Sequence, residues 1–252
     1  MPKYKLIFLI AALCSSVTSF AQKGTSFIGV DGGVSIPLGV WGKTSTASQL
    51  MSIDGTVNDK NGYAKAGGFF SVDGAWFFSQ HFGIGGLFKY GTYDLKGVDS
   101  LSQGYEESFD VDTTRTTVTN YKQWSILPGI YYNQQIMKKL AFTARVLVGI
   151  AHSSSPEINV GIEDGGVPDP AVVQSSASKT SFAGDAGVGL VYNVTRCIGI
   201  RLRADYFYTK PDFSIANSGR NNNAGREVSE YDQALSSVNF SLGVAYTFRH
   251  KK

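Results

Sequence analysis

The chain has 252 residues and a formal net charge of +3, and 42% of its residues are hydrophobic, 13% aromatic and only 17% charged. The hydrophobic share excludes a disordered chain, and the small net charge gives no argument for nucleic acid binding. A chain that is rich in glycine and aromatic residues but poor in charge is typical of many short strands with an apolar outer surface.

The beginning of the chain has the organisation of a secretory signal peptide. Two lysines among the first five residues are followed by an apolar run over 6–13, and small residues precede Gln22. The run is shorter than the roughly 20 apolar residues that a membrane anchor needs. We therefore predict a signal peptide over 1–21 that is cleaved after Ala21, and a mature domain over 22–252.

The mature chain then holds one cysteine, Cys197. It can form no internal disulfide, and a metal site of the cysteine-cluster kind is excluded. No later segment has 18 consecutive apolar residues, which excludes a helical membrane protein. No cofactor is expected.

A period-two alternation recurs eight times in the mature chain. Over 238–248, for example, large apolar side chains alternate with small or polar ones. Because successive side chains of a strand point to opposite faces, each segment predicts a strand with one apolar face and one small, polar face. Each has about ten residues, the length that a tilted strand needs to cross a bilayer. The predicted strands cover 28–36, 69–78, 82–90, 124–132, 140–150, 181–192, 198–208 and 238–248.

The connections between these strands alternate between short and long. The short breaks lie at 79–81, 133–139 and 193–197, and the long ones at 38–65, 95–123, 153–180 and 210–236. The long breaks are polar, and we expect them to be loops without structure of their own. Short periplasmic turns and long outer loops are typical of bacterial outer-membrane barrels, whereas four such loops would count against a compact soluble domain.

These patterns predict an all-β fold, an eight-stranded antiparallel up-and-down transmembrane β-barrel in the cell outer membrane. The alternative is a soluble β-sandwich or a lipocalin-like barrel, whose polar face is exposed and rich in lysine and glutamate. Here the polar face is mostly glycine, serine and alanine, which suits the crowded interior of a small barrel.

Eight charged residues share the inward parity of their predicted strands. An unpaired charge in a narrow interior is costly, so these four acids and four bases are expected to pair and to plug the lumen. The alternative is a gated ion path, but eight strands leave space only for side chains. The eight are Asp31, Asp73, Lys89, Arg145, Asp185, Arg201, Arg203 and Asp205.

Charges outside the strands are distributed unevenly. The short-turn end is basic, and it carries Lys23, Lys138, Lys139, Arg196, Arg249, Lys251 and Lys252. The long loops are acidic, and they carry Asp99, Glu106, Glu107, Asp110, Asp112, Glu157, Glu163, Asp164 and Asp169. The acids are either plain solvated loop residues or groups that bind cations between surface lipids or a partner, and the sequence does not name the partner of the loops.

The last predicted strand ends in Ser-Leu-Gly-Val-Ala-Tyr-Thr-Phe over 241–248. This segment resembles the C-terminal β-signal of outer-membrane proteins, with Ser241, Gly243, Tyr246 and Phe248 at the positions of the pattern, although a four-residue tail follows it. With the eight strands and the turn pattern, the mature chain resembles the small OmpA/OmpX-type family of Gram-negative outer-membrane β-barrels, grouped with the porins.

The resemblance implies several partners. During biogenesis these are the barrel-assembly machinery and periplasmic chaperones, and in the membrane they are outer-membrane lipid and lipopolysaccharide. No nucleic acid partner is expected. The expected function is a non-enzymatic barrel that presents four long surface loops for envelope structure or surface interaction, and a small diffusion pore is an alternative.

A second alternative is a lipid-modifying enzyme. His152-Ser153-Ser154, with Glu157 nearby, is similar to the His-x-Ser element of outer-membrane lipid A deacylases, which are also eight-stranded barrels. A single His-x-Ser is common by chance, and we predict no catalytic residues.

Overall fold

The structure is a computed structural model, and it describes residues 25–44, 61–99, 102–103, 106, 113–164, 167–219 and 227–249. The predicted signal peptide over 1–21, with its cleavage site between Ala21 and Gln22, lies outside these residues.

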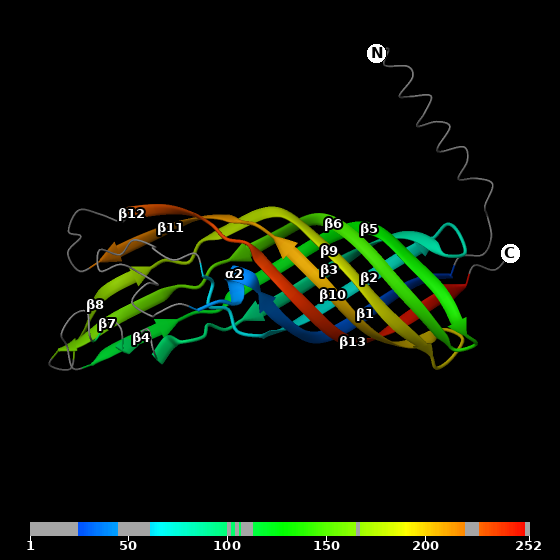
Figure 1. Cartoon of the computed structure of the whole chain (residues 1–252), viewed down its shortest axis with the longest axis horizontal. Coiled ribbons are helices and arrows are strands. Elements are labelled where there is room, and N and C mark those ends of the chain that lie inside the picture. The colour runs from blue at the N-terminus through cyan, green and yellow to red at the C-terminus, as the bar shows by residue number, and fades with distance from the viewer. Residues whose placement is uncertain are drawn as a thin grey trace, which may run out of the picture.

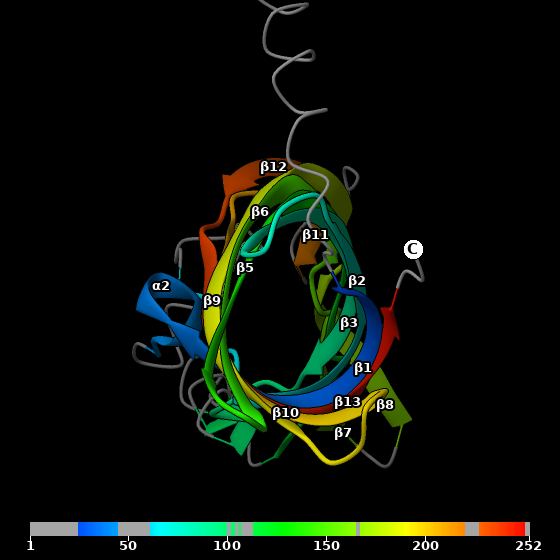
Figure 2. The ribbon, with the colours of Figure 1, turned by 90° about the vertical axis from the view of Figure 1, so that its right-hand side faces the viewer.

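Eight antiparallel strands close into a barrel in the order β1-β13-β10-β9-β6-β5-β3-β2 (Figures 1 and 2). The first and last strands pair along their whole length, from Thr25 opposite Arg249 to Leu38 opposite Ser236. The predicted eight-stranded barrel is therefore confirmed. The strands are β1 (Thr25–Leu38), β2 (Gly67–Phe77), β3 (Phe82–Tyr93), β5 (Tyr121–Met137), β6 (Leu140–Ser154), β9 (Ser178–Asn193), β10 (Ile198–Thr209) and β13 (Leu235–Arg249).

The outer face of the barrel is apolar, as the alternation predicts. Large side chains such as Val30, Ile130 and Leu242 are more than half exposed, at 57%, 56% and 62%. A closed barrel leaves no backbone hydrogen bond unsatisfied at an edge, so its apolar exterior can face lipid. The barrel is thus that of an outer-membrane protein. No helix in the described ranges has the length and apolar character needed to cross a membrane.

The inner face is less polar than the alternation predicts. A cluster of buried apolar side chains fills part of the lumen, and it contains Ala75, Phe77, Leu87, Leu127, Tyr131, Leu147, Ala151, Ala183 and Phe207. Inward glycines leave room for these larger side chains, so the small and polar interior expected from the sequence is only part of the observed one.

The turn between β5 and β6 is shorter than predicted. The break expected at 133–139 is reduced to Lys138 and Lys139, because Asn133 and Gln134 continue the β5 ladder opposite Thr143 and Phe142 of β6. Polar side chains at the membrane boundary interrupt the apolar pattern but not the backbone pairing.

Three of the four long connections are not loops without structure, so that expectation was wrong. They contain β4 (Thr114–Val118), β7 (Ile158–Asp164), β8 (Val167–Gln174), β11 (Asp212–Gly219) and β12 (Glu227–Asp232). These strands form a second sheet in the order β12-β11-β8-β7-β4, which we call the surface sheet. One face of this sheet is buried. Ile158 and Val160 on β7, and Phe213 and Ile215 on β11, point to that face.

The surface sheet continues the barrel wall. Its strands follow or precede β13, β10, β9, β6 and β5 along the chain, and they keep the spatial order of those five barrel strands. Figure 1 shows the sheet projecting beyond the end of the barrel opposite the short turns, which is the extracellular end.

A second apolar cluster lies where the surface sheet meets the barrel. It contains Trp41 from the four-residue helix α2 (Gly39–Gly42), together with Ala64, Tyr93, Tyr121, Phe213, Ile215 and Leu235. We call it the extracellular cluster. Trp41 is fully buried, with its ring 4.5 Å from that of Tyr93. The cluster joins the first connection, the barrel mouth and the surface sheet into one packed unit.

An arginine on the lipid-facing side of β13 should destabilise the barrel. Leu242→Arg places a charge in hydrocarbon, and we expect a loss of about 2–4 kcal/mol in the free energy of unfolding, measured by urea titration in lipid vesicles. Thr247→Arg, on the inward face near the periplasmic mouth, is the matched control and should cost less. Equal losses of unfolding free energy would show that the assignment of Leu242 to the lipid side of β13 and of Thr247 to the lumen side is wrong.

Candidate functional site

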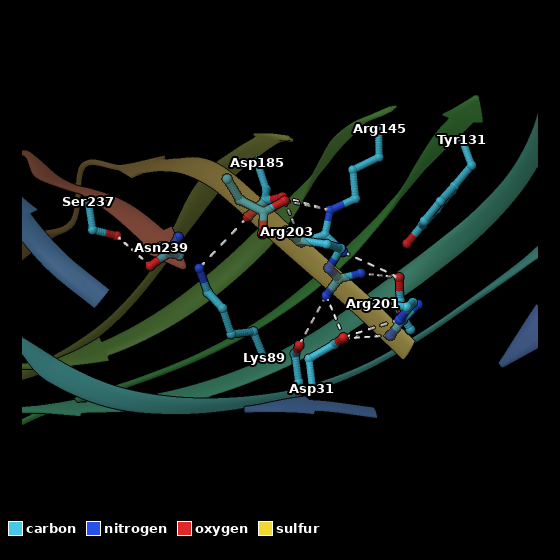
Figure 3. A network of polar contacts seen from close by, with 12 residues as sticks. Asp31, Lys89, Tyr131, Arg145, Asp185, Arg201, Arg203, Ser237 and Asn239 are labelled. Carbon is cyan, nitrogen blue, oxygen red and sulfur yellow. Dashed lines mark hydrogen bonds and ion pairs between the residues drawn. The ribbon is translucent and has the colours of Figure 1, made fainter. Parts of the chain in front are cut away.

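The eight charged residues singled out in the sequence all lie inside the barrel. Their exposed fractions run only from 2%, for Asp31, Asp73 and Asp185, to 6%, for Arg145 and Arg203. Six strands contribute them, namely β1, β2, β3, β6, β9 and β10. Figure 3 shows the side chains converging into one network across the lumen.

The first ion pair of the network spans three neighbouring strands. Asp31 on β1 and Arg201 on β10 both lie opposite Gly243 on the intervening β13. Above this glycine, Arg201 Nη2 approaches Asp31 Oδ2 at 2.5 Å, and its Nε donates to Asp31 Oδ1 at 3.1 Å. Two parallel N–H···O bonds of this kind are the strongest geometry for an arginine and a carboxylate.

A second ion pair repeats this arrangement. Arg145 on β6 and Asp205 on β10 both lie opposite Gly187 on β9. Arg145 Nη2 is 3.0 Å from Asp205 Oδ1 and its Nε is 3.1 Å from the same oxygen. Neighbouring strands are about 4.8 Å apart, and the missing side chain at Gly187 lets Arg145 reach straight across the intervening strand to Asp205.

Asp73 on β2 connects these pairs. It accepts from Arg201 Nη2 and Arg203 Nη1, both at 2.7 Å, and from Arg145 Nη1 at 3.3 Å. Arg203 also reaches back to Asp31, where its Nη2 donates to Oδ2 at 2.6 Å. The carboxylates of Asp31 and Asp73 are therefore held among three guanidinium groups.

Lys89 and Asp185 form the looser, extracellular side of the network. Lys89 Nζ lies 3.8 Å from Asp185 Oδ2, and Arg145 Nε lies 3.2 Å from Asp185 Oδ1. The ammonium also sits 4.0 Å from the ring centre of Phe207 and 5.6 Å from that of Phe69. Cation–π attraction from these rings compensates for the weak hydrogen bonding at this end.

Three glycines are essential to this geometry, and sequence reasoning missed their importance. A Cβ at Gly243 would overlap the Asp31 carboxylate, one at Gly187 the Asp205 carboxylate, and one at Gly29 the Arg201 guanidinium. At Gly243 and Gly187, the signal for such a pair is an inward glycine between opposite charges on its two neighbouring strands. That signal is readable only once the strand register is known.

The residues of the predicted assembly signal occupy both faces of β13. Ser241 and Gly243 point inward, and Ser241 is 3% exposed. Tyr246 and Phe248 point outward with their ring centres 4.9 Å apart. Recognition of this segment by the assembly machinery stays a prediction, and Gly243 has the separate structural role described above.

The His-x-Ser element lies on the outer face of β6, near the extracellular end. His152 Nδ1 is 2.9 Å from the hydroxyl oxygen of Thr180, and its ring stacks on Trp124. Ser154 Oγ bonds Ser178 Oγ at 2.7 Å rather than the histidine. Among the described residues, the structure brings no carboxylate to His152 and no group of three His, Cys, Asp or Glu that could hold a metal ion.

Glu106 and Glu157, two of the nine loop acids singled out in the sequence, accept hydrogen bonds within the described part of the chain. Glu106 Oε1 accepts from the backbone N–H of Thr114 at 2.9 Å, and Glu157 Oε1 accepts from Asn159 at 2.7 Å. Glu107, Asp110 and Asp112 lie outside the described residues. Glu106 and Glu157 therefore fasten strands β4 and β7, and cation binding by the loop acids stays a prediction.

No protein-family model and no curated protein sequence matches the chain. Among solved structures, it is similar to the attachment invasion locus protein of Yersinia pestis, with 16% identity, 90% of this chain and 100% of that chain covered, and a TM-score of 0.44. It is also similar to Neisserial surface protein A, with 13% identity, 89% and 99% covered, and a TM-score of 0.42. The chain is similar as well to a major outer membrane protein from Thermus thermophilus, with 13% identity, 88% of this chain and 99% of that chain covered, and a TM-score of 0.49.

Deleting one member of the network should cost more than deleting a surface charge. We expect Arg201→Ala and Asp31→Ala each to lower the free energy of unfolding by about 3–5 kcal/mol, because each leaves a buried charge uncompensated. The double variant should lose less than the sum. The measurement is urea unfolding in vesicles, with the exposed Lys179→Ala as control. Additive losses would show that the two residues do not interact.

Adding one methyl group beneath the first ion pair should also be harmful. Gly243→Ala brings a Cβ against the Asp31 carboxylate and the Val30 carbonyl, and we expect a loss of about 1–3 kcal/mol in unfolding free energy from overpacking. Gly32→Ala makes the same change on the outer face, where the nearest heavy atom is 3.9 Å away. If both variants unfold like the wild type, the close approach of Asp31 and Arg201 above Gly243 is wrong.

Proposed function

We propose that the protein is a non-enzymatic outer-membrane barrel, closed to ions, that serves as a rigid base for the surface sheet. One observation carries the proposal: five neighbouring barrel strands continue past the membrane as β12, β11, β8, β7 and β4 in unchanged order. A continuous wall of this kind holds an external sheet at a fixed height and orientation above the membrane.

The contents of the lumen support closure to ions. The ion-pair network contains as many acids as bases, and no member is more than 6% exposed. On its extracellular side lie Phe69, Leu147 and Phe207 of the barrel interior, and beyond them the extracellular cluster. An ion would have to displace both paired charges and packed apolar side chains to pass.

The surface sheet offers a polar exterior for contact outside the cell. Arg115 and Thr117 on β4, Ser214 on β11 and Glu230 on β12 are exposed. Strands β4 and β12 are the two edges of the sheet. We assign this sheet the role of envelope structure or surface interaction, and the barrel the role of holding it.

The orientation of the surface sheet is tested by labelling single cysteines in a Cys197→Ser background. On intact cells, a membrane-impermeant maleimide should react with Thr117→Cys and Ser214→Cys, which lie on exposed positions of the sheet. Lys138→Cys, in the turn between β5 and β6, should react only after the outer membrane is permeabilised. The reverse pattern would overturn the proposal, because the sheet would then face the periplasm.

Closure of the lumen is tested by recording conductance across planar bilayers. The refolded wild-type barrel should give no steady ion current, since charged and apolar side chains occupy the path. A trimeric diffusion porin, inserted under the same conditions, is the positive control. Stable steps of current from the wild type would show a conducting lumen and would favour the diffusion-pore alternative.

A further inference from the structure

The lumen is hollow on the periplasmic side of the ion-pair network. A cavity of about 420 Å³ extends from the turns β5–β6 and β9–β10 inward to Arg145, Arg201 and Arg203. Figure 2 views the barrel from this end. The volume falls in the range of about 300–1,000 Å³ that is usual for small-molecule sites.

The middle of this cavity is apolar. Its wall includes Phe27, Phe77, Tyr131, Val191 and Ala245. The ring of Phe27 lies 6.3 Å from that of Phe77 and 5.8 Å from that of Tyr131, so the three aromatic side chains pack against one another. A ligand in this part of the cavity would contact hydrocarbon and aromatic surface.

The mouth of the cavity is basic. Lys138, Lys139 and Arg196 line it, and all three are exposed. None of them takes part in an ion pair with another residue that the structure describes, whereas the charges at the floor are balanced within the network. The three cations therefore give the mouth an uncompensated positive charge that attracts anions.

Two buried polar atoms of the cavity lining have no hydrogen-bond partner in the described part of the chain. They are Arg203 Nε, from a residue that is 6% exposed, and Asn133 Oδ1. Buried polar atoms in proteins are nearly always satisfied, so we expect water molecules in the cavity to bond both atoms.

We propose that this cavity binds a single-chain anionic amphiphile that enters from the periplasm. Its carboxylate or phosphate would lie at Lys138, Lys139 and Arg196, and its chain against the packed rings of Phe27, Phe77 and Tyr131. On β2, Phe77 lies four residue steps from Asp73, which is about 10 Å along the barrel axis for a strand tilted by about 40°. This depth suits a chain of octyl length.

The site does not depend on an open lumen, because it ends at the ion-pair network. A conducting wild-type barrel would overturn the proposed closure and leave the binding experiment interpretable. In turn, failure to bind an amphiphile would leave the surface sheet and the plug untouched.

Calorimetry on the mature barrel in phosphatidylcholine nanodiscs tests the charge requirement. With the heat of empty nanodiscs subtracted, octanoate should bind saturably and octyltrimethylammonium should not. Lys138→Gln/Lys139→Gln/Arg196→Gln should weaken octanoate binding at least about tenfold. The matched control is Lys65→Gln/Lys122→Gln/Lys179→Gln, which removes three exposed cations from the other end and should bind like the wild type. Equal binding by the rim variant, or by the cationic chain, would overturn the proposal.

The location of the bound chain is tested by a cavity-filling variant and by NMR. Ala245 lies between Gly29 and Gly199 on the two adjacent strands, so Ala245→Leu should fold, fill the wall and abolish binding. In the wild type, octanoate should shift the amide signals of Val191 and Thr247 but not that of Tyr93. Shifts only at lipid-facing positions would place the ligand outside the lumen and refute the site.

The source of the ligand is distinguished by two probes that share the anionic single chain. Octanoate represents a free fatty acid, and a short-chain lysophosphatidylglycerol represents a phospholipid breakdown product. Binding of either one at the cavity supports the site and identifies its source, whereas binding of neither overturns it.

Discussion

Charges buried in a narrow barrel must be compensated by other charges, and this constraint organises the interior of the protein. Removing an aspartate or an arginine from water costs several kcal/mol, which is recovered only by close, well-oriented partners. The network meets this requirement with four acids and four bases, in which Asp73 alone contacts three arginines. Equal numbers of acids and bases are not enough: the charged groups stabilise the barrel only because each lies close to a partner of opposite charge.

The neighbouring regions of the lumen are arranged around that network. Glycines at 187 and 243 allow opposite charges to meet across an intervening strand. Larger apolar side chains fill the space on the extracellular side, and the extracellular cluster seals the mouth. On the periplasmic side the side chains leave the lumen partly unfilled, and the cavity remains. The barrel is thus filled unevenly along its axis, with its closed part toward the outside.

The sequence was sufficient for much of the fold because the bilayer imposes a strict alternation. The apolar side chains of 238–248 and of the other seven segments identified every barrel strand, and the same parity placed Arg145 and Asp205 inside. The sequence could not show that Arg145 pairs with Asp205. Their meeting across Gly187 depends on the strand register, and the alternation along one strand carries no information about the register with its neighbours.

The surface sheet was missed for a different reason. Above the membrane a strand needs only one or two apolar residues, such as Phe213 and Ile215, to bury one face against the rest of the protein. In a connection that is otherwise polar, so short an alternation cannot be told from chance. The order of β12, β11, β8, β7 and β4 follows from the barrel beneath them, so it too becomes apparent only after the barrel is built.

The pair formed by Asp31 and Arg201 also bears on how the chain folds. The two residues are separated by 170 positions, and they meet across β13, the strand whose pairing with β1 closes the barrel. A partly assembled sheet, lacking that last strand, would hold Arg201 and Asp31 apart and keep them hydrated, whereas Arg145 and Asp205 can already meet across β9. Closure of the seam and desolvation of Arg201 and Asp31 must therefore occur together. This coupling makes barrel formation cooperative, because an incomplete barrel gains little of the stability of the complete one.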